Sequence, residues 1–123
     1  MGTYGYPQSD WDRAKGEAKT VLYDYARRGH TITYTELTQR ISTIPFGPHN
    51  RDFHGLLDAV SRDEEEEGRG LLSVLVVRKD GDIKPGPGFF SMAEDVGREF
   101  HDELAFWISE FEAVVKANKK RPR

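Results

Sequence analysis

The amino-acid sequence predicts a single α+β domain built mainly of helices. Three observations lead to this prediction. Apolar residues recur at helical spacing in several segments, one segment is almost continuously apolar, and glycine or proline marks the boundaries between segments. The chain has 123 residues, 37% of them hydrophobic and 32% charged, which suits one domain of ordinary size. We expect residues 1–8 to be a flexible N-terminus and residues 119–123 to be a basic tail.

The composition excludes several kinds of site. Cysteine is absent, which rules out disulfides, thiol nucleophiles, zinc–thiolate centres and iron–sulfur clusters. The first residues contain no basic segment followed by an apolar one, and no apolar run is long enough to cross a bilayer. We therefore expect a cytoplasmic protein that does not enter a membrane.

The first predicted element is a helix that begins near Ser9, because serine oxygens commonly cap helix N-termini. Its apolar residues follow at helical spacing, and they are Trp11, Ala14, Ala18, Val21, Leu22, Tyr25 and Ala26. Gly29 predicts the end of this helix, because glycine readily adopts the left-handed conformation that follows a helix.

A short strand and a short helix are expected next. The segment of residues 30–33 is short and mostly β-branched, and it predicts one brief strand. Thr33 and Glu36 have the spacing of a capping box, and they predict a short helix that extends to Ile41. Residues 42–49 contain two prolines and a glycine and predict a loop.

Asn50 is expected to cap the third helix, which spans residues 50–62 and frays into a block of five acids at residues 63–67 before it ends by Gly68. One face of this helix is apolar, and its residues are Phe53, Leu56, Leu57 and Val60.

Residues 71–77 are almost continuously apolar and predict a buried strand. The Asp-Gly pair at residues 80–81 predicts a turn, after which a second strand from about Asp82 is expected to return antiparallel to the first. Pro85 and Pro87 cannot donate to a strand ladder, so this second strand is expected at an edge.

Ser91 and Glu94 again have capping-box spacing and predict one long helix that reaches Asn118. Its apolar residues are Val96, Phe100, Leu104, Trp107, Ile108, Phe111, Val114 and Val115.

The order of these elements resembles that of a winged helix. The segment Thr-Tyr-Thr-Glu-Leu at residues 33–37, the proline-containing loop, the third helix and the valine-rich strand are also similar to one half of a known family. This is the DNA-binding half of the O6-alkylguanine-DNA alkyltransferases and their alkyltransferase-like relatives, in which a Tyr-Gly-Glu-Leu type segment opens a helix-turn-helix. The similarity covers roughly residues 30–82 and implies a winged-helix-like fold.

The same comparison excludes the family's chemistry. The alkyltransferases carry a reactive cysteine in a Pro-Cys-His-Arg motif, whereas the corresponding residues 70–74 here are Gly-Leu-Leu-Ser-Val. Transfer of an alkyl group to cysteine is therefore excluded, and a shared fold does not settle function. Residues 71–90 also resemble small bacterial proteins without a known function.

One interpretation of the sequence is a non-enzymatic module that binds double-stranded DNA. The third helix would enter the major groove, where Arg and Asn read base edges, and cations of the hairpin would contact phosphate. The candidate residues are Asn50, Arg51, His54, Arg62, Arg78, Lys79 and Lys84. Two arginines stand against seven acids between residues 50 and 67, and such a charge balance opposes phosphate contact.

A second interpretation is a protein-interaction or adaptor module without nucleic-acid binding, which includes a homodimer formed through the last helix. The candidate surface consists of Phe100, Leu104, Trp107 and Phe111. The competing explanation is that these side chains pack into the domain's own core.

No motif predicts catalysis, a metal ion or a cofactor. Residues 86–88 precede a helix, where anions bind, but their proline favours a simple turn. His49 and His54, together with Asp52 and Asp58, could form a metal cluster, and His54 and Asp58 share a helical face. Two histidines alone are weak evidence, since such surface side chains are more often solvated than metal-bound. Ser73 lacks the glycines that flank a hydrolase nucleophile.

Overall fold

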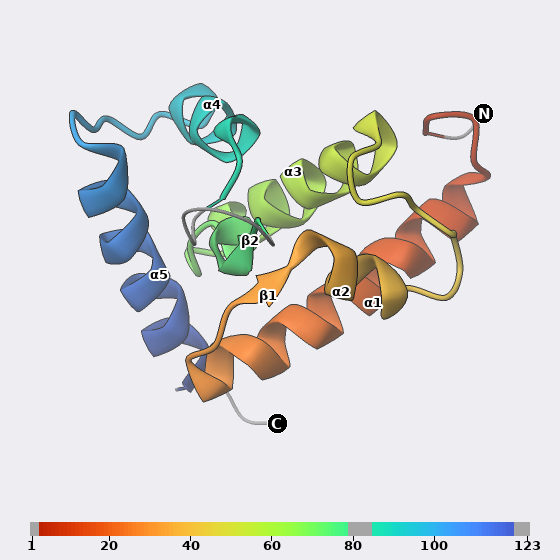
Figure 1. Ribbon diagram of the computed structural model, residues 1–123, viewed down its shortest axis with the longest axis horizontal. Coiled ribbons are helices and arrows are strands. Elements are labelled where there is room, and N and C mark those ends of the chain that lie inside the picture. The colour runs from red at the N-terminus through yellow and green to blue at the C-terminus, as the bar shows by residue number, and fades with distance from the viewer. Residues whose placement is uncertain (1–2, 79–84, 120–123) are drawn as a thin grey trace.

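The computed structural model describes residues 3–78 and 85–119, which form a helix-rich α+β fold (Figure 1). The five α-helices of these residues are α1 (Gln8–Arg28), α2 (Tyr34–Gln39), α3 (Arg51–Glu66), α4 (Pro87–Asp95) and α5 (Glu103–Lys119). The remaining elements are strand β1 (Ile32–Thr33), the 3₁₀ helix η1 (Leu72–Leu75) and strand β2 (Val76–Val77). None of the helices in the described ranges is both long and apolar enough to cross a membrane.

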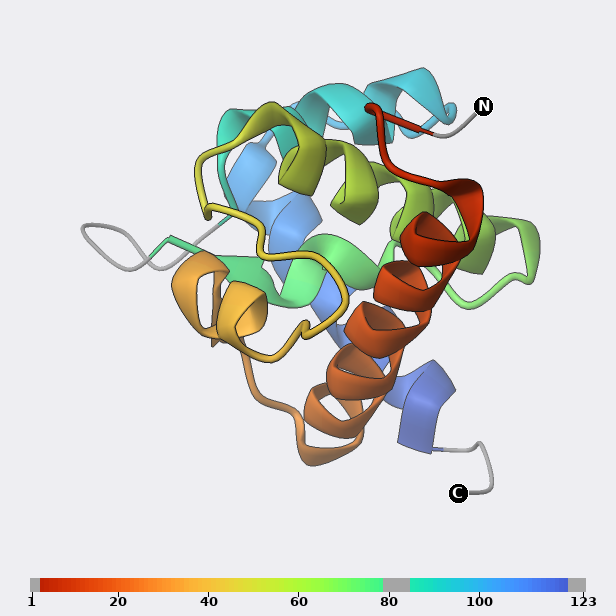
Figure 2. The same ribbon diagram turned by 90° about the vertical axis from the view of Figure 1, so that its right-hand side faces the viewer.

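The two strands lie near the middle of the molecule, with α1 below them, α3 and α4 above them and α5 at one side (Figure 1). Figure 2 shows α1 in front of α5, with α3 and α4 along the top. The 3₁₀ helix η1 is buried and contacts α1, α3 and α5. The hydrophobic core is therefore built around η1, and the long helices cover it from different sides.

Helix α1 buries the apolar stripe that its periodicity predicts, including Trp11 and Leu22. It ends at Gly29, as predicted, where the backbone adopts a φ of 69°. The predicted cap at Ser9 is wrong, because the helix already begins at Gln8 and the carbonyl of Pro7 accepts the first N–H groups. Proline suits this boundary, since its own missing N–H costs nothing there.

The predicted strand at residues 30–33 is confirmed as the two-residue β1, and the capping box of α2 is confirmed in full. The Thr33 hydroxyl accepts the Glu36 N–H at 3.1 Å, and the Glu36 carboxylate accepts the Thr33 N–H at 3.4 Å. Helix α2 ends at Gln39, so Ile41 lies beyond it, buried in the following loop. Because α2 has only six residues, its capping box largely determines where the helix begins.

The apolar face of α3 is buried as predicted, and Asn50 occupies the N-cap position. Its side chain makes no capping hydrogen bond, so that part of the prediction is wrong. The helix also does not fray at the acidic block, because it continues to Glu66. Ion pairs with distant parts of the chain hold these acids in place, as described below.

The predicted strand over residues 71–77 is wrong for most of its length. The segment forms η1 and only then the two residues of β2. Two side chains take the N–H groups that a strand ladder would need: Glu110 accepts the Leu71 N–H at 2.8 Å, and the Ser61 hydroxyl accepts the Ser73 N–H at 2.8 Å. The segment is buried throughout. Its apolar run therefore correctly indicates burial, but it does not indicate the backbone conformation.

Strand β2 pairs with β1 in parallel, with Ile32 beside Val76 and Thr33 beside Val77. This is not the predicted antiparallel hairpin. The predicted turn at residues 80–81 and the start of the return strand lie outside the described residues. Where the chain is described again, at Pro85, it leads directly into α4, with Pro87 in the first turn of that helix. The hairpin of a winged helix is therefore not confirmed.

The predicted long helix from Ser91 to Asn118 is also wrong, because it is broken into α4 and α5. Helix α4 ends in a Schellman motif: Gly97 has a φ of 95°, its N–H donates to Glu94 O at 3.0 Å, and the next N–H donates to Ala93 O at 3.0 Å. Asp102 then caps α5 by accepting the Ala105 N–H at 3.1 Å. The break allows α5 to turn back and pack against α1.

Four acids of the block at residues 63–67 form ion pairs within the molecule, and they are Asp63, Glu64, Glu65 and Glu67. Asp63 accepts Lys15 and Lys19 of α1, each at 2.9 Å. Glu64 is buried and accepts two hydrogen bonds from the Arg69 guanidinium, at 2.7 and 2.9 Å. Burial alone would raise the pKa of Glu64, but hydrogen bonds, the strongest of them from Arg69, hold that pKa below its ordinary value.

The buried carboxylate of Glu110 joins three parts of the chain. One oxygen accepts the Leu71 N–H at 2.8 Å, and the other accepts Arg98 at 2.5 Å. The same arginine also binds the Glu65 carboxylate through two nitrogens, at 2.6 and 3.2 Å. This network connects α5, the segment before η1, the α4–α5 connection and α3.

We predict that Glu110→Ala destabilises the protein by about 3 kcal/mol, because it leaves the Leu71 N–H and the Arg98 guanidinium without their buried partner. Urea unfolding measures the change. Glu112→Ala is the matched control, since Glu112 is exposed on the same helix, and it should change stability by less than about 0.5 kcal/mol. Equal effects of the two substitutions would contradict this role of Glu110.

We further predict a pH-dependent contribution from Glu17, which holds the loop after α2. Burial acts to raise its pKa, but hydrogen bonds from Ser42 and Thr43 outweigh burial and lower the pKa from 4.5 to about 2. Because the folded pKa lies below the unfolded one, the stabilisation is complete above pH 4.5 and is lost as the pH falls toward 2.

Accordingly, Glu17→Gln should reduce the free energy of unfolding by roughly 1 kcal/mol at neutral pH, a value discounted for partial exposure. The difference between the two proteins should shrink as the pH falls from 4.5 toward 2. Urea titrations of both proteins over this range test the prediction, and a difference that does not vary with pH would refute it.

Candidate functional site

A depression of about 470 Å³ lies where α2, α3, the end of β2 and the start of α4 meet. Aromatic, cationic and backbone groups surround it, and the lining residues are Tyr34, Thr35, His49, His54, Arg78, Gly86 and Pro87. They come from five separate segments of the chain, so only the folded molecule brings them together.

Tyr34 forms one wall of this depression and is held rigidly. It directly follows the capping residue of α2, its ring meets Phe53 edge-on with 6.4 Å between centroids, and its hydroxyl oxygen accepts the Gly86 N–H at 2.9 Å. Burial raises the pKa of Tyr34, although the Gly86 hydrogen bond and the charge of Arg78 oppose this effect. The hydroxyl therefore stays neutral at physiological pH.

The parallel strand pair places Arg78 beside Tyr34. Because Thr33 is in register with Val77, the next residues of the two strands, Tyr34 and Arg78, leave the sheet side by side. Arg78 is exposed. His54 completes this arrangement from α3, with its ring 5.4 Å from that of Tyr34. The site thus combines a guanidinium, an imidazole and a partly buried phenol.

A smaller recess of about 70 Å³ adjoins Tyr34 and His54 and extends to Asp58 and Ser73. Burial raises the pKa of Asp58, and the charges of Arg62 and His54 partly offset this rise. Ser73 is engaged in structural bonds, since its hydroxyl oxygen accepts the Ser61 hydroxyl at 2.7 Å. Ser73 thus joins η1 to α3 at this recess.

The structure brings together part of the predicted nucleic-acid face. His54 and Arg78 line the depression, and Asn50 and Arg51 are exposed at the start of α3. Arg62 stands apart, with its guanidinium 3.7 Å from the Asp95 carboxylate. Lys79 and Lys84 lie outside the described residues.

Sequence reasoning missed Tyr34, Thr35 and His49 as lining residues. The capping box already placed Tyr34 at the start of α2, but its neighbours depend on the β1–β2 register and on the chain returning at Gly86. Within residues 3–78 and 85–119, no group of three or more His, Cys, Asp or Glu side chains is placed to hold a metal ion.

The predicted partner surface divides into two parts. Phe100 stacks on Phe106 with 4.4 Å between centroids, and the Trp107 indole N–H donates to the Val74 carbonyl at 2.9 Å, so these two side chains pack toward the domain. Leu104 is 56% exposed, and Phe111 is partly buried beside a hollow on α5.

The comparisons with known proteins give no relative. No protein-family model, curated protein or solved structure matches this chain. The residues and their geometry therefore carry the functional argument alone.

Proposed function

We propose that this protein is a non-enzymatic, winged-helix-like module that binds double-stranded DNA through the start of α3 and the adjoining depression. The observation that carries the proposal is the position of Arg78, which comes from a different part of the chain and lines the same depression as Tyr34 and His54. Asn50 and Arg51 are exposed at the N-terminal end of the same helix.

The groups on this face suit a DNA groove. Recognition helices of helix-turn-helix proteins contact base edges with their N-terminal residues, and Arg51 lies in the first turn of α3. Arginine pairs with guanine and asparagine pairs with adenine in the major groove. Arg78 is exposed beside the start of α4, and in the proposed complex its guanidinium contacts a phosphate.

The fold also reduces the repulsion that the sequence predicts. Asp63, Glu64 and Glu65 bind cations of this same chain, and they begin about 18 Å along the helix axis from Arg51 at 1.5 Å per residue. Closer to the proposed face, Asp52 accepts the Tyr6 hydroxyl at 2.5 Å. Asp52 and Asp58 remain near this face, whereas Asp63, Glu64 and Glu65 are ion-paired and distant from Arg51.

The proposal predicts duplex binding that weakens with salt. Fluorescence anisotropy with a labelled duplex of about 20 base pairs should show binding at about 50 mM salt and much weaker binding at about 200 mM salt. Arg51→Ala and Arg78→Ala should each weaken binding roughly tenfold, and loss of a phosphate contact by Arg78 should lower the salt slope by about one.

Arg28→Ala is the control for these variants. It removes the same charge from the last turn of α1, at the opposite end of the molecule from the start of α3 (Figure 1), and it should leave binding unchanged. The proposal fails if no duplex binds at low salt, or if Arg28→Ala weakens binding as much as Arg78→Ala.

A further inference from the structure

Helix α5 carries an apolar stripe that the core of the domain covers only in part. Its residues recur at intervals of four, three and four, and they are Leu104, Ile108, Phe111 and Val115. Leu104 is 56% and Ile108 45% exposed, and the other two are partly buried. This spacing is that of a seam between two packed helices. The domain instead covers a different face of α5, which carries Glu110, Val114 and Asn118.

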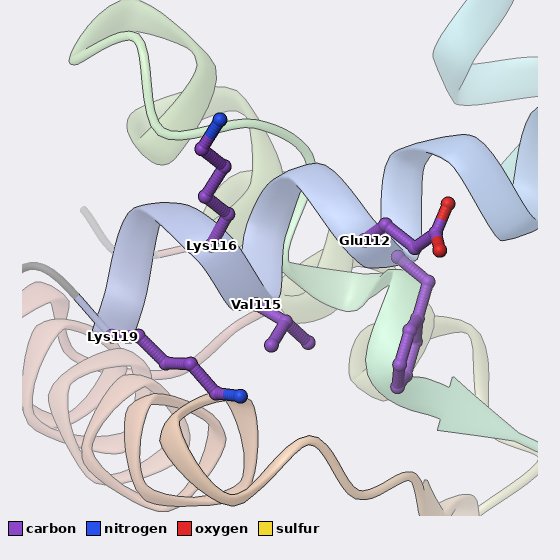
Figure 3. Close-up of a pocket in the computed structure, with 5 residues that line it drawn as sticks. Glu112, Val115, Lys116 and Lys119 are labelled. Carbon is purple, nitrogen blue, oxygen red and sulfur yellow. The ribbon is translucent and has the colours of Figure 1, made fainter.

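The stripe ends in a hollow of about 440 Å³, lined by Phe111 and by four further residues of the same helix. These four are Glu112, Val115, Lys116 and Lys119. They stand at positions i, i+3, i+4 and i+7, the four positions that form a hole for one side chain of a facing helix. Figure 3 shows the side chains of Lys116 and Lys119 extending to opposite sides of Val115.

The charges of α5 indicate which helix fits this hole. The helix is preceded by Asp102, begins with Glu103 and ends with Lys116 and Lys119 in its last turn, and all four residues are exposed. An antiparallel copy of the same helix would place its acidic first turn beside these lysines and would also oppose the two helix dipoles. A parallel copy would place like charges together.

We propose that the partner of this surface is a second copy of the chain, bound through antiparallel α5 helices in a two-fold symmetric dimer. Leu104 of each copy enters the hole around Val115 of the other copy. This register centres the two-fold axis between residues 109 and 110, so that Ile108 of each copy faces Phe111 of the other. Each apolar residue of the stripe then has a partner in the other copy, and the two-fold interface leaves no part of the stripe free to bind a third copy.

The dimer is independent of the proposed DNA binding. Helix α5 and the start of α3 lie on opposite sides of the molecule in Figure 1. A dimer through α5 therefore leaves the depression beside Tyr34 open in both copies, and either proposal can fail without the other.

Sedimentation equilibrium of the full chain tests the dimer. We expect a reversible monomer–dimer equilibrium at protein concentrations up to about 1 mM. Leu104→Lys should lower the association constant about tenfold or more, because it places a cation where a leucine is buried and beside Lys116 and Lys119 of the other copy. Ser109→Lys is the matched control, since Ser109 is exposed on α5 outside the stripe, and it should associate like the unchanged protein.

A strict monomer at that concentration overturns the proposal, and so do equal effects of Leu104→Lys and Ser109→Lys. Leu104 is exposed in the monomer, so circular dichroism should show that both variants keep the fold.

The orientation of the helices has its own test, because the chain contains no cysteine. Spin labels on Ala105→Cys or Ser109→Cys, both at exposed positions outside the stripe, report the distance between the two copies. At 1.5 Å per residue the antiparallel register gives an axial offset of about 14 Å between labels at 105 and about 2 Å between labels at 109. Parallel helices in register would give no axial offset at either position, and label distances that fit that arrangement and not the antiparallel one would overturn the proposal.

Discussion

The fold depends on one buried carboxylate. Glu110 is only 5% exposed, yet it accepts the Leu71 N–H and the Arg98 guanidinium, and Arg98 in turn binds Glu65 of α3. A buried charge is tolerated only when its oxygens are fully bonded, so these groups must meet in one arrangement. Their meeting fixes α5 against the segment that leads into η1, around which the core is packed.

The same carboxylate decides which surface of α5 faces solvent. Glu110 faces the core beside Val114 and Asn118. The apolar stripe of α5 therefore lies at the side of the helix or in solvent, and exposed apolar surface of this kind is unfavourable in water. The orientation of α5 about its own axis thus explains both the buried Glu110 and the partly exposed apolar stripe. The acidic end of α3 follows the same logic, since its carboxylates bind internal cations.

The proposed DNA face depends on a different constraint, the parallel pairing of β1 with β2. This short pairing puts Arg78 beside Tyr34, and the Tyr34 hydroxyl then holds the chain at Gly86, where α4 begins. Two residues of strand are enough because the capping box of α2 fixes the backbone immediately after β1. The contacts with Gly86 and Phe53 thus hold the Tyr34 wall of the depression in place before a ligand binds, which lowers the ordering cost of recognition.

The sequence by itself determined the elements whose signals are local: the stripe and glycine stop of α1, the capping box of α2 and the apolar face of α3. Only the tertiary structure decided the rest. Residues 71–77 read as a strand because an apolar run reports burial alone, whereas Ser61 and Glu110, 12 and 39 residues away from their partners, take the N–H groups of that segment. The local signal of Gly97 was present, but the helical periodicity continued across it. Likewise, His54 was predicted for the site and Tyr34 was not. The surroundings of Tyr34 depend on the register of β1 with β2 and on Gly86, and both partners lie far along the chain.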